Sequence, residues 1–414
     1  MDKRVLFVMI DGLADSGNEE LGGRTYLEAA NTPCLDSLVN RGVTGIVDPV
    51  ETGLACGSDT AHMSIFGYNP MKLYQGRGGF ETMGAGLQLD DGEIAFKCNF
   101  ATLDPGPNIV TKRRVSRKFY EWGLPMIDIL NEQTIPGFPL HKISVKHATE
   151  HRCGLKITGP RLTQRIEGTD PLTDHKPLLK SVPWEVNDED SLFTSEVINA
   201  TSDFIHSLLS THPINLERQA KNKSPANILL LRGAGVRIKV DKFDEVHQVR
   251  SFFIAPTAII KGWGMTIQSE IVEVQGATGD VYSNHQAKFD KALELFAEGF
   301  NFGFLHIKAI DDLGHDKNLQ DRIRMMEKID KLIGQTFEKI TRTVLVVTGD
   351  HSTNIHIGDH SYEPVPILLC STDSQISSQN LRFTEIDCSK GVLGRFPGSQ
   401  VMGTIFNFLS NQNY

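Results

Sequence analysis

The fold of this chain is indicated by the stretch Thr343-Val344-Leu345-Val346-Val347-Thr348-Gly349-Asp350-His351-Ser352-Thr353. Its first half is apolar and β-branched over the length of a strand, and the run then breaks at a glycine into an adjacent aspartate and histidine. In open α/β sheets, ligands bind beyond the carboxyl ends of the strands. The stretch therefore predicts a buried strand that ends at a site, although two polar residues in an ordinary turn would give the same pattern.

The same pattern of an apolar strand followed by polar residues occurs twice more. Val5–Ile10 is a continuous apolar run and is followed by Asp11. Phe302–Ile307 is followed by a segment that carries Asp311 and His315, four residues apart and therefore on one face of a helical turn. Continuous apolar runs are typical of strands buried on both faces of a parallel sheet. The expected helices begin at Pro33 and Ser58 and cover 190–210, 286–300 and 319–339.

Strands and helices alternate at both ends of the chain, which predicts an α/β fold with one doubly wound, mainly parallel sheet. From about Asp90 the sequence pattern changes to short stretches of alternating polar and apolar residues, which turns rich in Pro, Gly and Asp separate. The first pattern returns near Lys261. We therefore expect a discontinuous sheet domain of residues 1–89 and 255–414, with a smaller α+β domain inserted at residues 90–254.

Composition excludes several classes of protein. The 414 residues are 40% hydrophobic and 22% charged, which is ordinary for a globular protein with a large core. A net charge of −9, with no basic cluster larger than the one at residues 112–118, argues against a nucleic-acid partner. The apolar run at the N-terminus is too short for a signal peptide or a membrane span. The six cysteines are scattered without a C-x-x-C pair, which indicates reduced thiols in a cytoplasmic protein.

Ser58 follows a stretch of small residues and glycines, at a position where a helix is expected to begin. A serine at a helix N-terminus lies among free backbone N–H groups, which favour a bound phosphate. The simpler interpretation is a helix-capping serine, which needs no chemistry. Both interpretations stay open from the residues alone.

Seven polar residues at predicted strand ends could together hold metal ions: Asp11, Ser58, Asp311, His315, Asp350, His351 and His360. Three carboxylates, three imidazoles and one hydroxyl are enough for two divalent ions, an arrangement that clamps phosphoryl groups. Carboxylates offset the charge of the ions, and imidazoles select transition metals over calcium.

These motifs, in this order, resemble the alkaline phosphatase superfamily: Asp11-Gly12, Gly57-Ser58-Asp59-Thr60-Ala61-His62, Asp311-x-x-x-His315-Asp316, and Asp350-His351-Ser352-Thr353 with His360-Ser361. Further segments narrow the resemblance to the archaeal-type cofactor-independent (2,3-bisphosphoglycerate-independent) phosphoglycerate mutases. These segments are Tyr74-x-Gly76-Arg77-Gly78-x-Phe80-Glu81, Cys98-Asn99-Phe100-Ala101-Thr102, Glu150-His151-Arg152, Leu230-Leu231-Arg232-Gly233-Ala234-Gly235, Lys261-Gly262 and Ala277-Thr278-Gly279. The resemblance covers essentially the whole chain.

The resemblance implies an isomerase of glycolysis and gluconeogenesis that interconverts 3-phosphoglycerate and 2-phosphoglycerate through a phosphoserine on Ser58. It implies one divalent ion on Asp11, Ser58, Asp350 and His351, and a second on Asp311, His315 and His360. Manganese is the expected ion, with zinc, cobalt or magnesium as alternatives. The inserted domain would close over the small phosphoglycerate substrate. The candidate contacts to its anionic groups are Lys261, Arg232, Arg77, His151 and Arg152.

Two other functions compete with this interpretation. A metal-dependent phosphohydrolase or a phosphopentomutase would use the same scaffold, because fold does not fix function. A sulfatase is disfavoured, because no Cys/Ser-x-Pro-x-Arg motif surrounds Ser58. A catalytically silent, metal-stabilised binding protein would be favoured if Ser58 or a ligand were replaced. The other histidines, including His306, are expected to be core or surface residues, and the role of His62 stays open. The sequence does not indicate an oligomeric state or a membrane partner.

Overall fold

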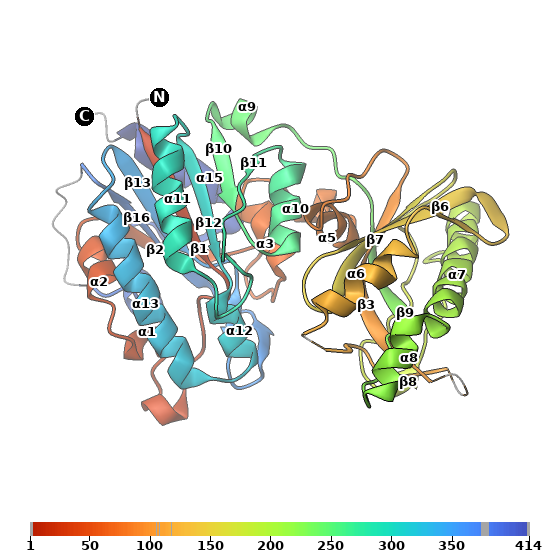
Figure 1. Cartoon of the computed structure of the whole chain (residues 1–414). Coiled ribbons are helices and arrows are strands. Elements are labelled where there is room, and N and C mark those ends of the chain that lie inside the picture. Colours follow the sequence, from red (N-terminus) through yellow and green to blue (C-terminus); the bar gives the residue numbers. More distant parts are fainter. Residues whose placement is uncertain (1–2, 105, 107, 117, 374–380, 412–414) are drawn as a thin grey trace. The chain divides into compact units, whose positions relative to one another are not determined.

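The computed structural model describes residues 3–104, 106, 108–116, 118–373 and 381–411, and its chain divides into two compact units (Figure 1). The first unit consists of Met1–Leu73 and Val240–Tyr414, and the second of Tyr74–Lys239. Both units combine helices with a β-sheet, so the predicted α/β class is confirmed.

Three adjacent parallel strands at the centre of the first unit are the ones that the sequence predicts. Strand β1 (Arg4–Ile10) pairs with β12 (Phe302–Ile307) on one side and with β13 (Thr343–Thr348) on the other. All residues of β12 and β13, and all of β1 except its first, are buried. Because parallel neighbours point the same way, the segments that follow these strands leave the sheet at one edge.

The sheet of the first unit has eight strands in the order β11-β10-β12-β1-β13-β16-β2-β17. Strand β16 is antiparallel to both of its neighbours, and the other pairs are parallel, so the sheet is mainly parallel. The remaining strands are β2 (Val43–Asp48), β10 (Ser251–Ile254), β11 (Glu270–Ile271), β16 (Val365–Ser371) and β17 (Gly394–Pro397).

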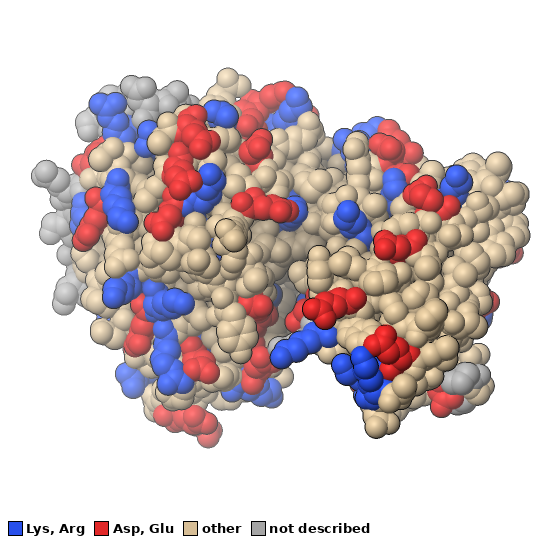
Figure 2. Space-filling view, viewed as in Figure 1, with Lys and Arg blue, Asp and Glu red and all other residues tan. Residues whose placement is uncertain are grey.

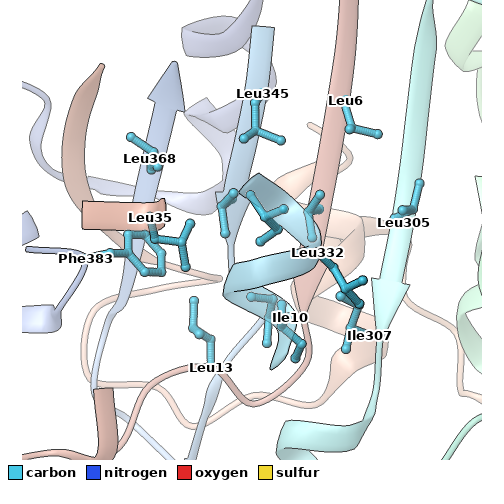
Figure 3. Close-up of a cluster of buried hydrophobic side chains, with 14 of the residues drawn as sticks. Leu6, Ile10, Leu13, Leu35, Leu305, Ile307, Leu332, Leu345, Leu368 and Phe383 are labelled. Carbon is cyan, nitrogen blue, oxygen red and sulfur yellow. The ribbon is translucent and has the colours of Figure 1, made fainter. Parts of the chain in front are cut away.

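Helices cover both faces of this sheet. On one face, alternate strand residues such as Leu6, Ile10 and Leu305 join Leu332 of α13 in one buried cluster (Figure 3). On the other face, Phe7 stacks on Phe66, which ends α3 and also contacts Trp263 of α10. The helices of this unit are α1 (Tyr26–Ala29), α2 (Pro33–Val39), α3 (Ser58–Ile65), α4 (Pro70–Leu73), α9 (Phe243–His247), α10 (Ala258–Thr266), α11 (His285–Ala297), α12 (Ala309–His315), α13 (Leu319–Phe337), α14 (Glu385–Cys388) and α15 (Val401–Asn411).

The second unit contains a separate, antiparallel sheet in which β3 is central and pairs with β7, β4 and β9. Its strands are β3 (Ile94–Leu103), β4 (Ile109–Lys112), β5 (Gln133–Ile135), β6 (Phe138–His147), β7 (Arg152–Thr158), β8 (Lys176–Pro177) and β9 (Ile228–Gly235). Its helices are α5 (Gly78–Gly84), α6 (Tyr120–Asp128), α7 (Glu189–Ser210) and α8 (Pro213–Ala220). The unit has its own buried cluster, in which the apolar face of α7 packs with residues of the strands.

The unit boundaries differ from the expected ones at both ends. Residues 74–89 were expected in the sheet domain, but α5 lies against the second sheet, where Thr82 Oγ1 donates to the Phe96 carbonyl at 3.1 Å. Residues 240–254 were expected in the inserted domain, but β10 pairs with β12 in the first sheet. In both cases the boundary is decided by strand pairing and packing, which the local sequence pattern does not reveal. Among the described helices, none is long and apolar enough to span a membrane.

Candidate metal centre

The predicted ligands lie at the edge of the first sheet, where β1, β12 and β13 end. Asp11 follows β1 directly, α12 follows β12, and Asp350 follows β13 after Gly349. Gly12 allows these segments to meet: a Cβ there would lie 2.8 Å from the Cβ of Asp311 and closer still to Thr353 Oγ1. The backbone N–H of Gly12 also donates to Asp350 Oδ1 at 3.1 Å, which ties two of the segments together.

Asp11, Asp350 and His351 form one group of potential metal ligands. His351 Nε2 lies 3.2 Å from Asp11 Oδ1 and 3.5 Å from Asp350 Oδ2. All three residues are at most 1% exposed. Burial lowers the pKa of His351, but Asp350 and Asp11 raise it to about 9. The neighbouring carboxylates therefore favour the protonated form of His351, and the ring must lose that proton to ligate a metal.

Ser58 joins this group from a different element. It is the first residue of α3, and its Oγ lies 3.3 Å from His351 Nε2. Gly57 occupies the N-cap position, and no side chain caps the helix. The interpretation of Ser58 as a simple N-cap is therefore wrong, and its hydroxyl is directed to the ligand group instead.

Asp311, His315 and His360 lie together beside the first group. Asp311 and His315 are one turn apart on α12, with Nε2 of the histidine 3.3 Å from Asp311 Oδ2. The β14–β15 hairpin (Ser352–Asn354 and Asp359–Ser361) brings His360 Nε2 to 3.6 Å from Asp311 Oδ1. His315 Nδ1 and His360 Nδ1 lie 2.8 and 2.9 Å from the backbone oxygens of Gly358 and Cys56, which fixes both rings with Nε2 toward Asp311. The ring of His360 also stacks on that of His351, with centroids 3.6 Å apart.

The residues present fit divalent cations. Asp11 Oδ1 and Asp350 Oδ2 are buried, and within the described residues neither accepts a hydrogen bond. Buried carboxylates need paired charge, because leaving an anion alone in a low-dielectric interior is costly. Burial raises the pKa of Asp350, and the neighbouring Asp11 raises it further. The anionic form of Asp350 is thus disfavoured without a further cation, and the oxygen and imidazole donors suit a transition metal.

Three residues at the centre are missed by sequence reasoning. Lys308 hydrogen-bonds Asp311 through Nζ and also lies 3.3 Å from Asp11 Oδ2. His306 belongs to the core as expected, but its Nε2 is 3.0 Å from Asp11 Oδ2. His62, on α3, places Nδ1 2.7 Å from the Ser58 carbonyl oxygen and 3.6 Å from Asp350 Oδ2. Lys308 and His306 flank the end of β12, and that position at a strand end is the signal that could have selected them.

Four of the five predicted anion-binding residues lie in the second unit. Arg77 donates to Glu81 at 3.1 Å, and Lys97, which the sequence does not single out, lies 3.0 Å from the same oxygen. Burial raises the pKa of Glu81, but Lys97, Arg77 and then Arg152 lower it to about 2. Arg232 and His151 also lie near these residues, because, in addition to burial, the charge of Arg77 lowers the pKa of Arg232 and the charge of Arg152 lowers the pKa of His151.

Burial, followed by the charges of Arg152 and Arg114, lowers the pKa of His151 to about 3. This buried imidazole is therefore neutral, and both of its nitrogens lack a hydrogen-bond partner among the described residues. The fifth predicted residue, Lys261, is on α10 in the first unit and pairs with the exposed Glu273. On the face seen in Figure 2, basic and acidic side chains are interspersed over both units.

Comparison with known proteins identifies relatives along nearly the whole chain. The family model described as 2,3-bisphosphoglycerate-independent phosphoglycerate mutase matches residues 40–215. The enzyme of that name numbered 1 in Methanothermobacter thermautotrophicus is 35% identical over 407 residues, which cover 98% of each chain. The enzyme of that name in Pyrococcus abyssi is 37% identical over 413 residues, or 99% of this chain and 98% of its own.

Two solved structures resemble the whole chain. A protein from Pyrococcus horikoshii superposes with a TM-score of 0.81 at 31% identity, covering 100% of this chain and 98% of its own. A cofactor-independent phosphoglycerate mutase from Thermoplasma acidophilum superposes with a TM-score of 0.69 at 29% identity, covering 98% of this chain and 100% of its own.

Proposed function

The chain belongs to the family of 2,3-bisphosphoglycerate-independent phosphoglycerate mutases, and from this we propose that it interconverts 3-phosphoglycerate and 2-phosphoglycerate through a phosphoserine on Ser58, at a centre of two divalent metal ions. The observation that carries the proposal is the position of the Ser58 hydroxyl, 3.3 Å from His351 Nε2 in a group of buried carboxylates. A hydroxyl in such a group can act as a nucleophile toward phosphorus, because nearby cations stabilise its deprotonated form.

The reaction consists of two phosphoryl transfers. In the first, Ser58 Oγ forms a bond to phosphorus while the bond between phosphorus and O3 of glycerate breaks, and O3 takes up a proton. In the second, O2 of the same glycerate forms a bond to phosphorus, loses its proton, and the Ser58 ester breaks. No net proton or water is consumed. Splitting the transfer in this way makes each displacement in-line, as covalent catalysis permits.

We assign the metal ions as the family resemblance implies. Asp11, Ser58, Asp350 and His351 would hold one ion, and Asp311, His315 and His360 the other. When bound, such ions supply Lewis-acid stabilisation of the phosphoryl oxygens and lower the pKa of a coordinated hydroxyl. Manganese is the proposed ion, because mixed carboxylate and imidazole donors suit a first-row divalent metal.

The second unit would contribute anion binding. Arg77 and Lys97 pair with Glu81, and Arg152 pairs with Glu150, while the charge of Arg77 acts on the nearby Arg232. These four cations outnumber the two acids that pair with them. Guanidinium groups bind carboxylate and phosphate in a bidentate manner. We propose that this group recognises the phosphoglycerate anion, and that the enzyme is cytoplasmic, where its six free cysteines would stay reduced.

The test is a coupled assay in which purified protein receives 3-phosphoglycerate, with enolase as the reporter of 2-phosphoglycerate. Turnover is expected with Mn²⁺ and without added 2,3-bisphosphoglycerate. Protein quenched during turnover of substrate labelled in the phosphoryl group should carry the label on the peptide that contains Ser58. Release of inorganic phosphate without 2-phosphoglycerate would instead identify a phosphohydrolase, and label on no serine would refute the phosphoserine route.

A further inference from the structure

Lys308 links the two groups of potential metal ligands. Its Nζ hydrogen-bonds Asp311, which belongs to one group, and lies 3.3 Å from Oδ2 of Asp11, which belongs to the other. The side chain is 21% exposed, whereas those of Asp11 and Asp311 are 2% and 0% exposed. The lysine side chain is therefore more accessible to solvent than the two carboxylates that it contacts, as a group that meets an incoming substrate must be.

The lysine is placed at the end of β12 by the same sheet edge that places the ligands. It is the residue that precedes α12, and α12 carries Asp311 one turn further on. The side chain of Lys308 thus starts between β12 and α12, which keeps its ammonium near the ligand residues. A lysine whose only role was to balance one buried acid would need to contact one carboxylate, whereas Lys308 contacts two.

Binding of cations changes the situation of this ammonium. When each carboxylate ligates a divalent ion, its negative charge is taken up, and the ammonium is left next to like charges. A nearby group of opposite charge is then the anionic phosphoryl group that is transferred between Ser58 and glycerate. Positively charged donors that meet the developing charge on phosphoryl oxygens are a major part of catalysis of phosphoryl transfer.

Building on the proposed function, we propose that Lys308 is a further catalytic residue, whose ammonium leaves Asp11 and Asp311 when metal binds and donates to the transferring phosphoryl group. Lysine suits this role because its compact charge on a flexible stem can change partners, which a rigid guanidinium does less readily. The same residue would oppose metal binding in the metal-free protein, because it competes with the ions for two carboxylates.

The proposal predicts opposite effects on metal affinity and on turnover. Lys308→Met removes the charge and retains the length of the side chain. Its Mn²⁺ affinity, measured by calorimetry after chelation, should equal or exceed that of the wild type. Its kcat at saturating Mn²⁺ should fall by about 100-fold to 1,000-fold, the usual effect of removing one donor to transition-state charge. Lys308→Arg should retain part of the turnover.

A matched control is Lys291→Met, which makes the same change in an i,i+3 surface pair with Glu294 on α11. This variant should match the wild type in both measurements. Wild-type turnover and the Ser58 label are measured first, so an inactive wild type counts against the proposed function and not against Lys308. Full turnover of metal-saturated Lys308→Met would overturn the proposal. So would a loss of Mn²⁺ binding in parallel with activity, because Lys308 would then only support the ligands.

Discussion

Ser58 Oγ lies 3.3 Å from His351 Nε2, although the two residues are 293 positions apart in the chain. Gly57, and not Ser58, occupies the N-cap of α3, and no side chain caps this helix. The hydroxyl is therefore not needed for the helix to begin. This relationship separates a catalytic role of Ser58 from a structural one and leads to the first prediction.

Ser58→Ala should leave the fold intact and abolish turnover. The change removes one oxygen that makes no cap hydrogen bond, so the free energy of unfolding should change by less than about 1 kcal/mol. The kcat for the conversion of 3-phosphoglycerate should fall by at least about a thousandfold, because the nucleophile is missing. Ser64→Ala, which removes a hydroxyl from the same helix, serves as the control and should stay active. Near wild-type turnover of Ser58→Ala would disprove the phosphoserine mechanism.

Removal of metal should abolish activity reversibly. Chelation leaves the buried oxygens Asp11 Oδ1 and Asp350 Oδ2 without a hydrogen bond from the described residues, so the stripped protein should also melt at a lower temperature. Mn²⁺, Co²⁺ or Zn²⁺ should restore turnover better than Ca²⁺, because imidazole ligands favour transition metals. Full activity in excess chelator, after elemental analysis shows that no metal remains, would contradict this expectation.

Arg322→Met should destabilise the protein strongly. Arg322 of α13 is fully buried, pairs with the buried Asp15, and donates to the Gly12 carbonyl at 2.7 Å. Removing the guanidinium leaves the Asp15 carboxylate without its partner, which costs about 3–5 kcal/mol in comparable pairs. Urea unfolding at fixed Mn²⁺ measures the change. Arg324, two residues along the same helix, is 70% exposed and pairs with Asp321, so Arg324→Met should cost less than about 1 kcal/mol.

Glu385→Gln should alter the pH dependence of stability. Burial raises the pKa of Glu385 to about 7 from its usual value near 4.5. The folded protein therefore holds a proton that the unfolded chain releases, and this contribution to stability is lost as the pH rises from about 4.5 to 7. The variant keeps a neutral amide oxygen that can accept from the Asp15 N–H, and its NH2 group can donate to the Thr25 hydroxyl oxygen, so it should lack this loss.

Urea midpoints of the two proteins, compared at pH 5 and pH 8 in chelator, test this expectation. The variant should gain stability relative to the wild type as the pH rises. Glu294→Gln, at a carboxylate that is 62% exposed, is the control and should show no such gain. A constant difference between wild type and Glu385→Gln across this range would show that Glu385 is ionised throughout.

Limited proteolysis should locate the unit boundaries. We expect cleavage near the Leu73–Tyr74 and Lys239–Val240 junctions, where the compact units meet in sequence. Cleavage within 78–84 or 251–254 should be slow, because α5 and β10 are part of packed sheets. Fragments that begin near 90 and 255 instead would favour the boundaries expected from the sequence.

The central strands could be predicted from the sequence because they are buried on both faces. Most positions of β1, β12 and β13 carry apolar side chains, so the local sequence pattern reflects the buried environment directly. The helices α7, α11 and α13 likewise follow their amphipathic patterns to within a few residues of the expected bounds. Asp11, Asp311 and Asp350 lie close together because each follows one of these adjacent strands, and the carboxyl ends of parallel strands share an edge.

The features that could not be predicted from the sequence depend on contacts between distant segments. The roles of Lys308 and His306 follow from their distances to Asp11, some 300 positions away, and a single sequence carries no record of such distances. The boundary error near residue 74 has the same origin, since α5 looks like the end of one domain until its packing on β3 is seen.

The pairing of β12, β1 and β13 sets the spacing of the ligand residues at the metal centre. Neighbouring strands lie about 4.8 Å apart, a spacing that backbone hydrogen bonds set and side chains hardly affect. Asp311, Asp11 and Asp350 follow three consecutive strands, so the distances between their attachment points are inherited from peptide geometry and not from loop conformation. Substitutions in the covering helices can therefore accumulate without disturbing the spacing of the ligand residues, whereas a one-residue slip of β1 would remove Asp11 from the group that it forms with Asp350 and His351.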